Sequence, residues 1–146
     1  MTEPNSEEAV RRLVYDWFEK ITDHAPFDEI VSHFIDNSPE MRMRFPDQDV
    51  ANIEEFRQWY TNVINRYFDQ AHVVKSLRIQ REENIALLDV QVEWSAKYWQ
   101  PPEPRSSRVR MDAFQRWVVR HNPETGKWGI KTYLVDNLFN VADVGQ

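Results

Sequence analysis

The sequence predicts an α+β fold in which a curved antiparallel β-sheet packs against three N-terminal helices. Residues 70–137 alternate apolar and polar side chains over long stretches separated by turn residues, which is typical of consecutive strands. The N-terminal half instead repeats its apolar residues at steps of three and four, which is typical of helices that bury one face. We therefore expect a cone-shaped sheet with helices over one face, a central pocket, and a single domain spanning residues 1–146.

The three helices follow from apolar spacing and from residues that start or stop a helix. Asn5 and Glu8 form a capping pair at the start of the first helix, which should end before Pro26. Pro26 suits the first turn of a second helix, which we expect to reach residues 36–39. Asn52 has the same capping spacing at the start of the third. The apolar stripes are Val10, Leu13, Val14, Trp17, Phe18 and Ile21; Phe27, Ile30, Val31, Phe34 and Ile35; and Ile53, Phe56, Trp59, Tyr60, Val63, Ile64 and Tyr67.

Residues 41–45, between the second and third helices, alternate at period two and are followed by Pro46. Proline has no N–H to donate to a neighbouring strand, so it is confined to the margins of sheets. We therefore expect a short edge strand here.

The turn between the first two long strands sets their register. With a two-residue turn, Ile79 lies opposite Leu88 on the apolar face. Strict alternation would then place Lys75 on that face too, so we expect a β-bulge at Lys75 and Ser76. The bulge would bring His72 onto the apolar face and bend the sheet around a cavity. We expect the helices to cover the face that bears Leu77, Ile79, Leu88, Val90, Val92, Trp94 and Trp117.

The opposite face of the strand at residues 108–120 carries alternating arginines. These lie across from acidic residues such as Asp89 and Glu93, and we interpret them as cross-strand ion pairs and not as a phosphate or nucleic-acid site. Phe114 and Val118 are apolar residues on this charged face. Together they predict a homodimer that forms through the outer face of the sheet.

Composition excludes several classes of function. A net charge of −6 is unsuited to nucleic-acid or anionic-membrane binding, and no apolar run is long enough to span a membrane. The polar, acidic first eight residues do not resemble a signal peptide, so we expect a cytoplasmic protein. With no cysteine and no ligand-like histidine spacing, we expect neither a metal nor another cofactor. The four histidines are His24, His33, His72 and His121.

Several short motifs resemble the SnoaL-like branch of the nuclear transport factor 2-like superfamily. His72 is followed five and seven residues later by apolar side chains, which is similar to a common strand pattern of that branch. The resemblance implies a cone-shaped fold with a pocket. Its members include isomerases, dehydratases, cyclases, epoxide hydrolases and non-catalytic binding domains. The other motifs are Phe27-Asp28-Glu29-Ile30, Phe45-Pro46, and Trp128-Gly129-Ile130 followed by Tyr133 and Asp136.

The resemblance also shows where this chain departs from the superfamily's enzymes. Its dehydratases place a Tyr and an Asp on the first helix, where this chain has Phe18 and, near the second position, Asp23. The paired carboxylates of the steroid isomerases have no counterpart on the inward strand positions. These differences favour binding without catalysis.

His72 is the candidate catalytic residue, because a pocket histidine with a pKa near neutrality suits proton transfer. The alternative is a structural histidine whose nitrogens are satisfied by neighbours. Candidate ligand-binding residues are Trp94 and Gln115 on inward positions, Tyr15 at the edge of the first helix's stripe, and Tyr133 and Asp136 on the last strand. A second bulge would be needed to turn Tyr133 inward. Asp136 either reaches the pocket rim or pairs at the surface.

Two functions follow from this pattern. The first is a domain that binds a small hydrophobic molecule in the pocket or serves only as a dimer module. The alternative is a lyase or isomerase that uses His72 to move a proton on an apolar ring-bearing substrate.

Overall fold

The computed structural model describes residues 6–34 and 41–140, which form three helices and six strands. None of the described helices has the length and apolar character needed to cross a lipid bilayer. The helices are α1 (Ser6–Thr22), α2 (Phe27–Val31) and α3 (Ile53–Arg66). The strands are β1 (Arg42–Phe45), β2 (Gln48–Val50), β3 (Tyr67–Glu82), β4 (Ile85–Tyr98), β5 (Ser107–Asn122) and β6 (Lys127–Asn140).

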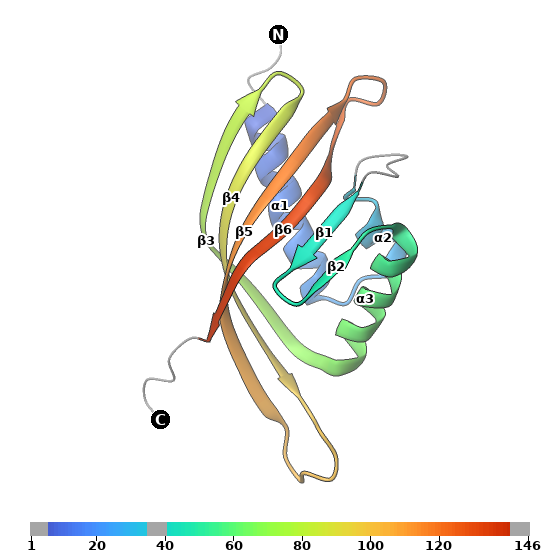
Figure 1. Ribbon diagram of the computed structural model, residues 1–146, viewed down its shortest axis with the longest axis vertical. Helices are drawn as coiled ribbons and strands as arrows, with labels where there is room; N and C mark the ends of the chain where they lie inside the picture. The colour runs from blue at the N-terminus through green and yellow to red at the C-terminus, as the bar shows by residue number, and fades with distance from the viewer. Residues whose placement is uncertain (1–5, 35–40, 141–146) are drawn as a thin grey trace.

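One curved, open sheet holds all six strands in the order β2-β1-β6-β5-β4-β3 (Figure 1). The pairs are antiparallel except β1 with β6, which is parallel, so the sheet is mixed. Helix α1 lies across one face of the long strands, and α2 and α3 lie beside β1 and β2 (Figure 1). The expected α+β cone is thus confirmed, with the addition of β2.

The predicted register of β3 and β4 is confirmed. Ile79 pairs with Leu88, and the register shifts by one residue at Lys75, which is the expected bulge. His72 consequently lies opposite Trp94 on the concave face of the sheet. A second irregularity, between Phe68 and Ala71, was not predicted.

The capping pattern before α3 forms as expected. The Asn52 side chain accepts a hydrogen bond from the backbone N–H of Glu55 at 2.9 Å. The Glu55 carboxylate in return accepts from the N–H of Ala51 at 2.8 Å. Pro26 precedes α2 as its N-cap residue and does not lie within its first turn. The corresponding Asn5 cap of α1 lies outside the described residues.

Helix α2 is much shorter than its apolar spacing predicted. It ends at Val31, because the next residues join the sheet. The carbonyl of His33 accepts the N–H of Ile130 at 2.8 Å, and Phe34 forms a parallel bridge with Ile130. Phe34, whose spacing suits a helix, is therefore buried through its contact with β6. The rest of the expected helix, from Ile35 onward, lies outside the described residues.

Strand β1 is not the edge strand that Pro46 suggested. It pairs with β6 on one side and with β2 on the other. Phe45, the last residue of β1, pairs with Gln48, so Pro46 lies in the turn between these strands. No N–H is needed from proline there. The edge strand on this side of the sheet is β2, which has three residues and a polar start, too little pattern to predict a strand.

Two bulges in β6 explain why its apolar residues do not alternate. Lys131 and Asp136 are extra residues relative to the register of β5. As a result Ile130, Tyr133 and Val135 are all buried on the same face. The bulge that would turn Tyr133 inward is thus confirmed.

An aromatic cluster joins α1 to the sheet. Trp17, which is fully buried, contacts Tyr133, Phe56 and Trp117 with ring centroids 5.4, 6.1 and 6.3 Å apart. Burying large aromatic side chains is the strongest apolar contribution available to a domain of this size. On the face that the helices were predicted to cover, Leu88, Val90, Val92 and Trp117 are buried, and Leu77, Ile79 and Trp94 are partly buried.

A buried histidine connects α1 to the segment after α2. His33 Nε2 lies 2.6 Å from Asp16 Oδ2, and His33 Nδ1 lies 3.1 Å from the carbonyl oxygen of Ile30. Both partners are oxygen acceptors, so the ring is held between α1 and the end of α2. The sequence pattern gave no indication of this role.

Trp117→Ala should lower the free energy of unfolding by about 3–5 kcal/mol, the usual cost of truncating a large buried aromatic. Trp117 is 1% exposed and packs on Trp17, Phe18 and Tyr133. Urea denaturation followed by circular dichroism measures the change. The control is Val73→Ala on β3, where the side chain is 57% exposed and the expected loss is below about 1 kcal/mol. Equal losses for the two variants would contradict this account of the core.

Candidate functional site

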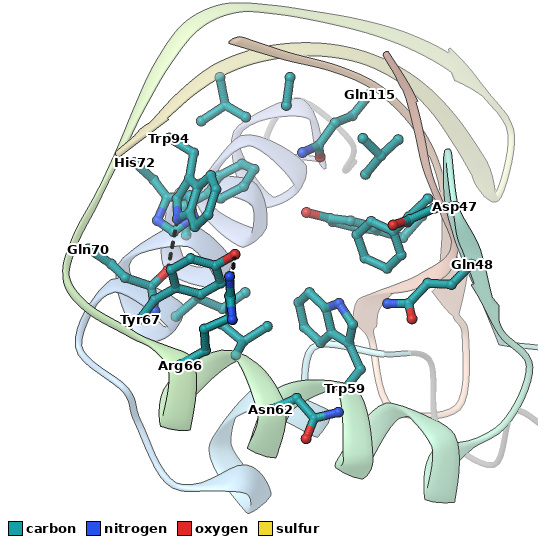
Figure 2. Close-up of a pocket in the computed structure, with 18 residues that line it drawn as sticks. Asp47, Gln48, Trp59, Asn62, Arg66, Tyr67, Gln70, His72, Trp94 and Gln115 are labelled. Carbon is teal, nitrogen blue, oxygen red and sulfur yellow. Dashed lines mark hydrogen bonds between the residues drawn. The ribbon is translucent and has the colours of Figure 1, made fainter. Parts of the chain in front are cut away.

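A cavity of about 390 Å³ lies between the concave face of the sheet and helices α1 and α3 (Figure 2). Its walls are mainly apolar and aromatic, with a few polar side chains directed inward (Figure 2). This volume is within the range of about 300–1,000 Å³ that small-molecule sites occupy. The lining residues are Phe18, Ile21, Phe45, Asp47, Gln48, Trp59, Asn62, Val63, Arg66, Tyr67, Gln70, His72, Val92, Trp94, Ala113, Gln115, Tyr133 and Val135.

His72 reaches the cavity wall from β3, where the bulge at Lys75 turns it inward. Its ring stacks on Phe18 of α1, with centroids 5.3 Å apart and an interplanar angle of 27°. Its Nδ1 lies 2.8 Å from the hydroxyl oxygen of Thr22. Burial against these groups lowers the pKa of His72 to about 4, because a charged imidazolium loses its hydration there. The ring is therefore neutral at neutral pH.

Thr22 was not predicted to be a site residue. It lies one helical turn after Phe18, so both side chains face His72 from the same side of α1. That spacing was the signal available in the sequence. Asp23, the residue near the position of the dehydratase Asp, is exposed. A hydroxyl carries no charge, so Thr22 orients His72 without supplying the opposite charge that would favour its protonated form.

Trp94 is held by a chain of hydrogen bonds that reaches His24, in the turn after α1. Its Nε1 donates to Gln70 Oε1 at 2.9 Å, and Gln70 Nε2 lies 2.8 Å from His24 Nε2. Because an indole N–H only donates, Gln70 must present its oxygen to Trp94 and its amide N–H to His24. His24 Nε2 is therefore the acceptor and carries no proton. Gln70 and His24 were not predicted, since the irregularity after Phe68 hides the inward phase of Gln70.

Gln115 and Tyr133 form the wall contributed by β5 and β6. Gln115 is 6% exposed, and its Oε1 accepts the indole N–H of Trp117 at 2.8 Å. Gln115 therefore has a buried hydrogen-bond partner in Trp117. Burial raises the pKa of Tyr133 to about 12, so its phenol stays protonated at neutral pH. Gln115 and Tyr133 both line the cavity.

The remaining polar lining residues come from the end of α3 and from the turn between β1 and β2 (Figure 2). Asn62 and Arg66 belong to α3, Asp47 lies in the turn, and Gln48 is the first residue of β2. All four are exposed, so they lie where the cavity meets solvent. Sequence analysis did not single them out, because polar residues on the exposed side of a helix or in a turn are ordinary.

Two of the predicted ligand-binding residues lie away from the cavity. Asp136 is the extra residue of a β6 bulge and faces outward, where its carboxylate accepts hydrogen bonds from Arg116 at 2.7 and 3.2 Å. Tyr15 is 47% exposed and follows the buried Val14, so it points off the apolar stripe of α1. The structure does bring His72, Trp94, Gln115 and Tyr133 together around the cavity.

The outer face of the sheet carries ion pairs between strands. Arg110 of β5 donates to Glu93 of β4 at 2.8 Å, and Lys75 lies 3.1 Å from Asp112 of β5. These contacts confirm the cross-strand interpretation of the arginines. Within residues 6–34 and 41–140, no three histidine or acidic side chains converge as a metal site requires.

Comparison with known proteins places the fold. No protein-family model matches the sequence, and no curated protein matches it either. Among solved structures, a ketosteroid isomerase-like protein from Erwinia carotovora atroseptica is similar with a TM-score of 0.69 and 13% identity, covering 94% of this chain and 98% of that one. A Streptomyces avermitilis protein of the NTF2-like family is similar with a TM-score of 0.74 and 12% identity, covering 96% of this chain and 99% of that one. A type 2 hexachlorocyclohexane dehydrochlorinase is similar with a TM-score of 0.74 and 12% identity, covering 95% of this chain and 90% of that one. The chain therefore has the nuclear transport factor 2-like fold that its sequence resembles.

Proposed function

We propose that the protein binds a small, apolar, ring-bearing molecule in the cavity, with one or more ligand oxygens directed toward its polar groups. The observation that carries the proposal is the arrangement of neutral polar groups in an aromatic-lined cavity of about 390 Å³. Apolar walls with a few placed polar groups are the general character of small-molecule sites. Trp94 and Phe18 offer faces for a ring, and His72 and Gln115 offer polar groups for an oxygen.

The electrostatics of the inner cavity favour a neutral group there. His72 is neutral because its pKa is lowered to about 4. Tyr133 is neutral as a phenol ordinarily is, and burial raises its pKa further, to about 12. A buried ligand charge would meet no opposite charge among these residues, and burying an unpaired charge is costly. The part of the ligand that reaches His72 is therefore an uncharged carbonyl, hydroxyl or ring.

A second candidate function is proton transfer by His72, as in a lyase or isomerase. The contact that favours it is Thr22, which orients the neutral ring through Nδ1 and leaves Nε2 for a substrate. A hexachlorocyclohexane dehydrochlorinase and a ketosteroid isomerase-like protein share this fold. Against it, a pKa of about 4 makes His72 a weak base at neutral pH, since proton transfer is most efficient when the pKa lies near the working pH. Binding is therefore the better-supported function.

We also propose that two copies associate through the outer sheet face. Phe114 and Leu87 are 37% and 40% exposed there, and Val118 lies beside them on β5. Light scattering coupled to gel filtration should give twice the mass of the chain at micromolar concentration. A Leu87→Glu variant should shift the protein toward monomer, because like charges would meet across a two-fold contact. A wild-type monomer at tens of micromolar would overturn the proposal.

His72→Ala should weaken binding of ring ketones such as 1-indanone, because the variant loses both a hydrogen-bond partner and packing on Phe18. We expect a loss of about fivefold to tenfold, the value of one neutral hydrogen bond plus some apolar contact. Titrations followed by tryptophan fluorescence measure it, with Trp94 as a reporter in the wall.

The matched control is His121→Ala, which removes a histidine that contacts Trp128 away from the cavity. It should bind as the wild type does. If His72→Ala binds every ketone that the wild type binds with unchanged affinity, His72 is a structural histidine and neither candidate function uses it.

The neutral state of His72 predicts how stability depends on pH. The pKa falls from 6.5 in the unfolded chain to about 4 in the folded protein, so the unfolded chain binds the proton more readily. The contribution of neutral His72 to the free energy of unfolding is therefore complete above about pH 6.5. It is lost as the pH falls toward 4, by up to about 3 kcal/mol. Urea unfolding at several pH values, compared between wild type and His72→Gln, isolates this contribution.

Thr22→Asp tests the cause. A carboxylate beside Nδ1 should raise the pKa of His72, measured from its imidazole proton shifts by NMR, and reduce the loss of stability at low pH. A wild-type His72 that titrates near 6.5 would contradict burial as the controlling effect.

A further inference from the structure

Arg66 is a cation at the cavity mouth that no carboxylate neutralises within the part of the chain that the structure describes. Its Nε donates to the hydroxyl of Tyr67 at 3.2 Å. Its guanidinium also lies over the rings of Tyr67 and Tyr98, 5.5 and 5.2 Å from their centroids. By contrast, Lys75 and Lys97 each pair with an acidic side chain.

These contacts hold the guanidinium in place while leaving donors available. An arginine presents five N–H donors, and only Nε is engaged with Tyr67 in the described structure. The two tyrosine rings restrict its motion, so less conformational entropy is lost when a ligand binds. In Figure 2 the Arg66 side chain lies beside Tyr67 at the edge of the cavity, on the opposite side from Asp47 and Gln48.

The charge of Arg66 outweighs the opposing local field. It is the last residue of α3, and the C-terminal end of a helix carries about half a unit of negative charge. The full positive charge of the guanidinium exceeds that partial charge. The end of α3 therefore presents a net positive charge at the mouth, next to an apolar interior.

We propose that the ligand is an aromatic or alicyclic carboxylic acid, with its ring in the cavity and its carboxylate on Arg66 at the mouth. This inference rests on the proposed binding function and names the chemical class of its ligand. A planar carboxylate matches the fork of a guanidinium and forms two charge-assisted hydrogen bonds with it. The carboxylate lies at the mouth because the inner residues His72, Gln115 and Tyr133 offer it no positive charge.

Paired ligands separate charge recognition from ring binding. Calorimetric titration with 2-naphthoate and with its neutral amide, 2-naphthamide, holds the ring constant. Wild type should bind the carboxylate more tightly than the amide. Arg66→Gln should weaken 2-naphthoate roughly fivefold, as expected for an exposed bidentate ion pair, and leave 2-naphthamide unchanged. Raising the salt concentration should weaken only the carboxylate.

Asp47→Asn is the matched control, because it removes a charge of the opposite sign from the same mouth. It should tighten 2-naphthoate binding slightly, because it removes a negative charge that repels the carboxylate. Arg66→Lys should retain part of the preference, since it keeps the charge but not the fork.

Each result has a distinct meaning. Equal affinity of wild type for the two ligands, or equal losses for both ligands in Arg66→Gln, would overturn the carboxylate assignment and leave the binding function standing. A loss in Asp47→Asn as large as in Arg66→Gln would show that the rim acts through its shape and would also overturn it. If neither ligand binds the wild type, the proposed binding function itself fails, and the carboxylate assignment fails with it.

Discussion

Side chains alternate along a strand, so the extra residue at Lys75 determines which side chains of β3 face the cavity. On one side of the bulge, Ile79 and Leu77 pack toward the helices; on the other, the phase reverses and His72 does so. Without that residue, His72 would face solvent, and α1 would meet no polar group from β3 at this level. The bulge also bends the strand, as bulges generally do. The bulge at Lys75 therefore affects both the shape of the cavity and which polar side chains line it.

The same constraint acts again on β6, with the opposite consequence for two neighbouring residues. The bulges at Lys131 and Asp136 keep Tyr133 and Val135 facing inward while Asp136 itself turns out to meet Arg116. The bulge at Lys131 therefore assigns Tyr133 to the cavity wall, and Asp136, three residues further along β6, lies on the outer surface. This explains why two residues from one motif of the sequence lie on opposite faces of the sheet.

Sequence patterns predicted the long strands because one face of each is buried and the other is exposed to solvent, so apolar and polar side chains alternate regularly. The bulge at Lys75 was predictable because a lysine would otherwise have been buried. By contrast, α2 was overestimated because Phe34 is apolar for a different reason, its bridge to Ile130, and periodicity cannot distinguish the two kinds of burial. Thr22 and Gln70 were missed because their roles depend on contacts across the fold, 50 and 46 residues away in the chain. The cavity mouth was missed because its residues look like ordinary surface.

The polar groups around the cavity are mutually consistent in their hydrogen bonding, and this consistency limits the chemistry. Gln70 has its oxygen on Trp94 and its N–H on His24, and Gln115 has its oxygen on Trp117. Each of these contacts fixes a neutral partner and none introduces a negative charge beside His72.

A general base that must become an imidazolium is best supported by a carboxylate, as general acid–base sites show. Here the position next to His72 is held by a hydroxyl, so protonation of the ring gains little. The charged groups lie instead at the mouth, where water and Arg66 can solvate a ligand's charge without bringing it inside. This separation, neutral within and charged at the rim, suits retention of an amphiphilic ring compound better than its chemical conversion.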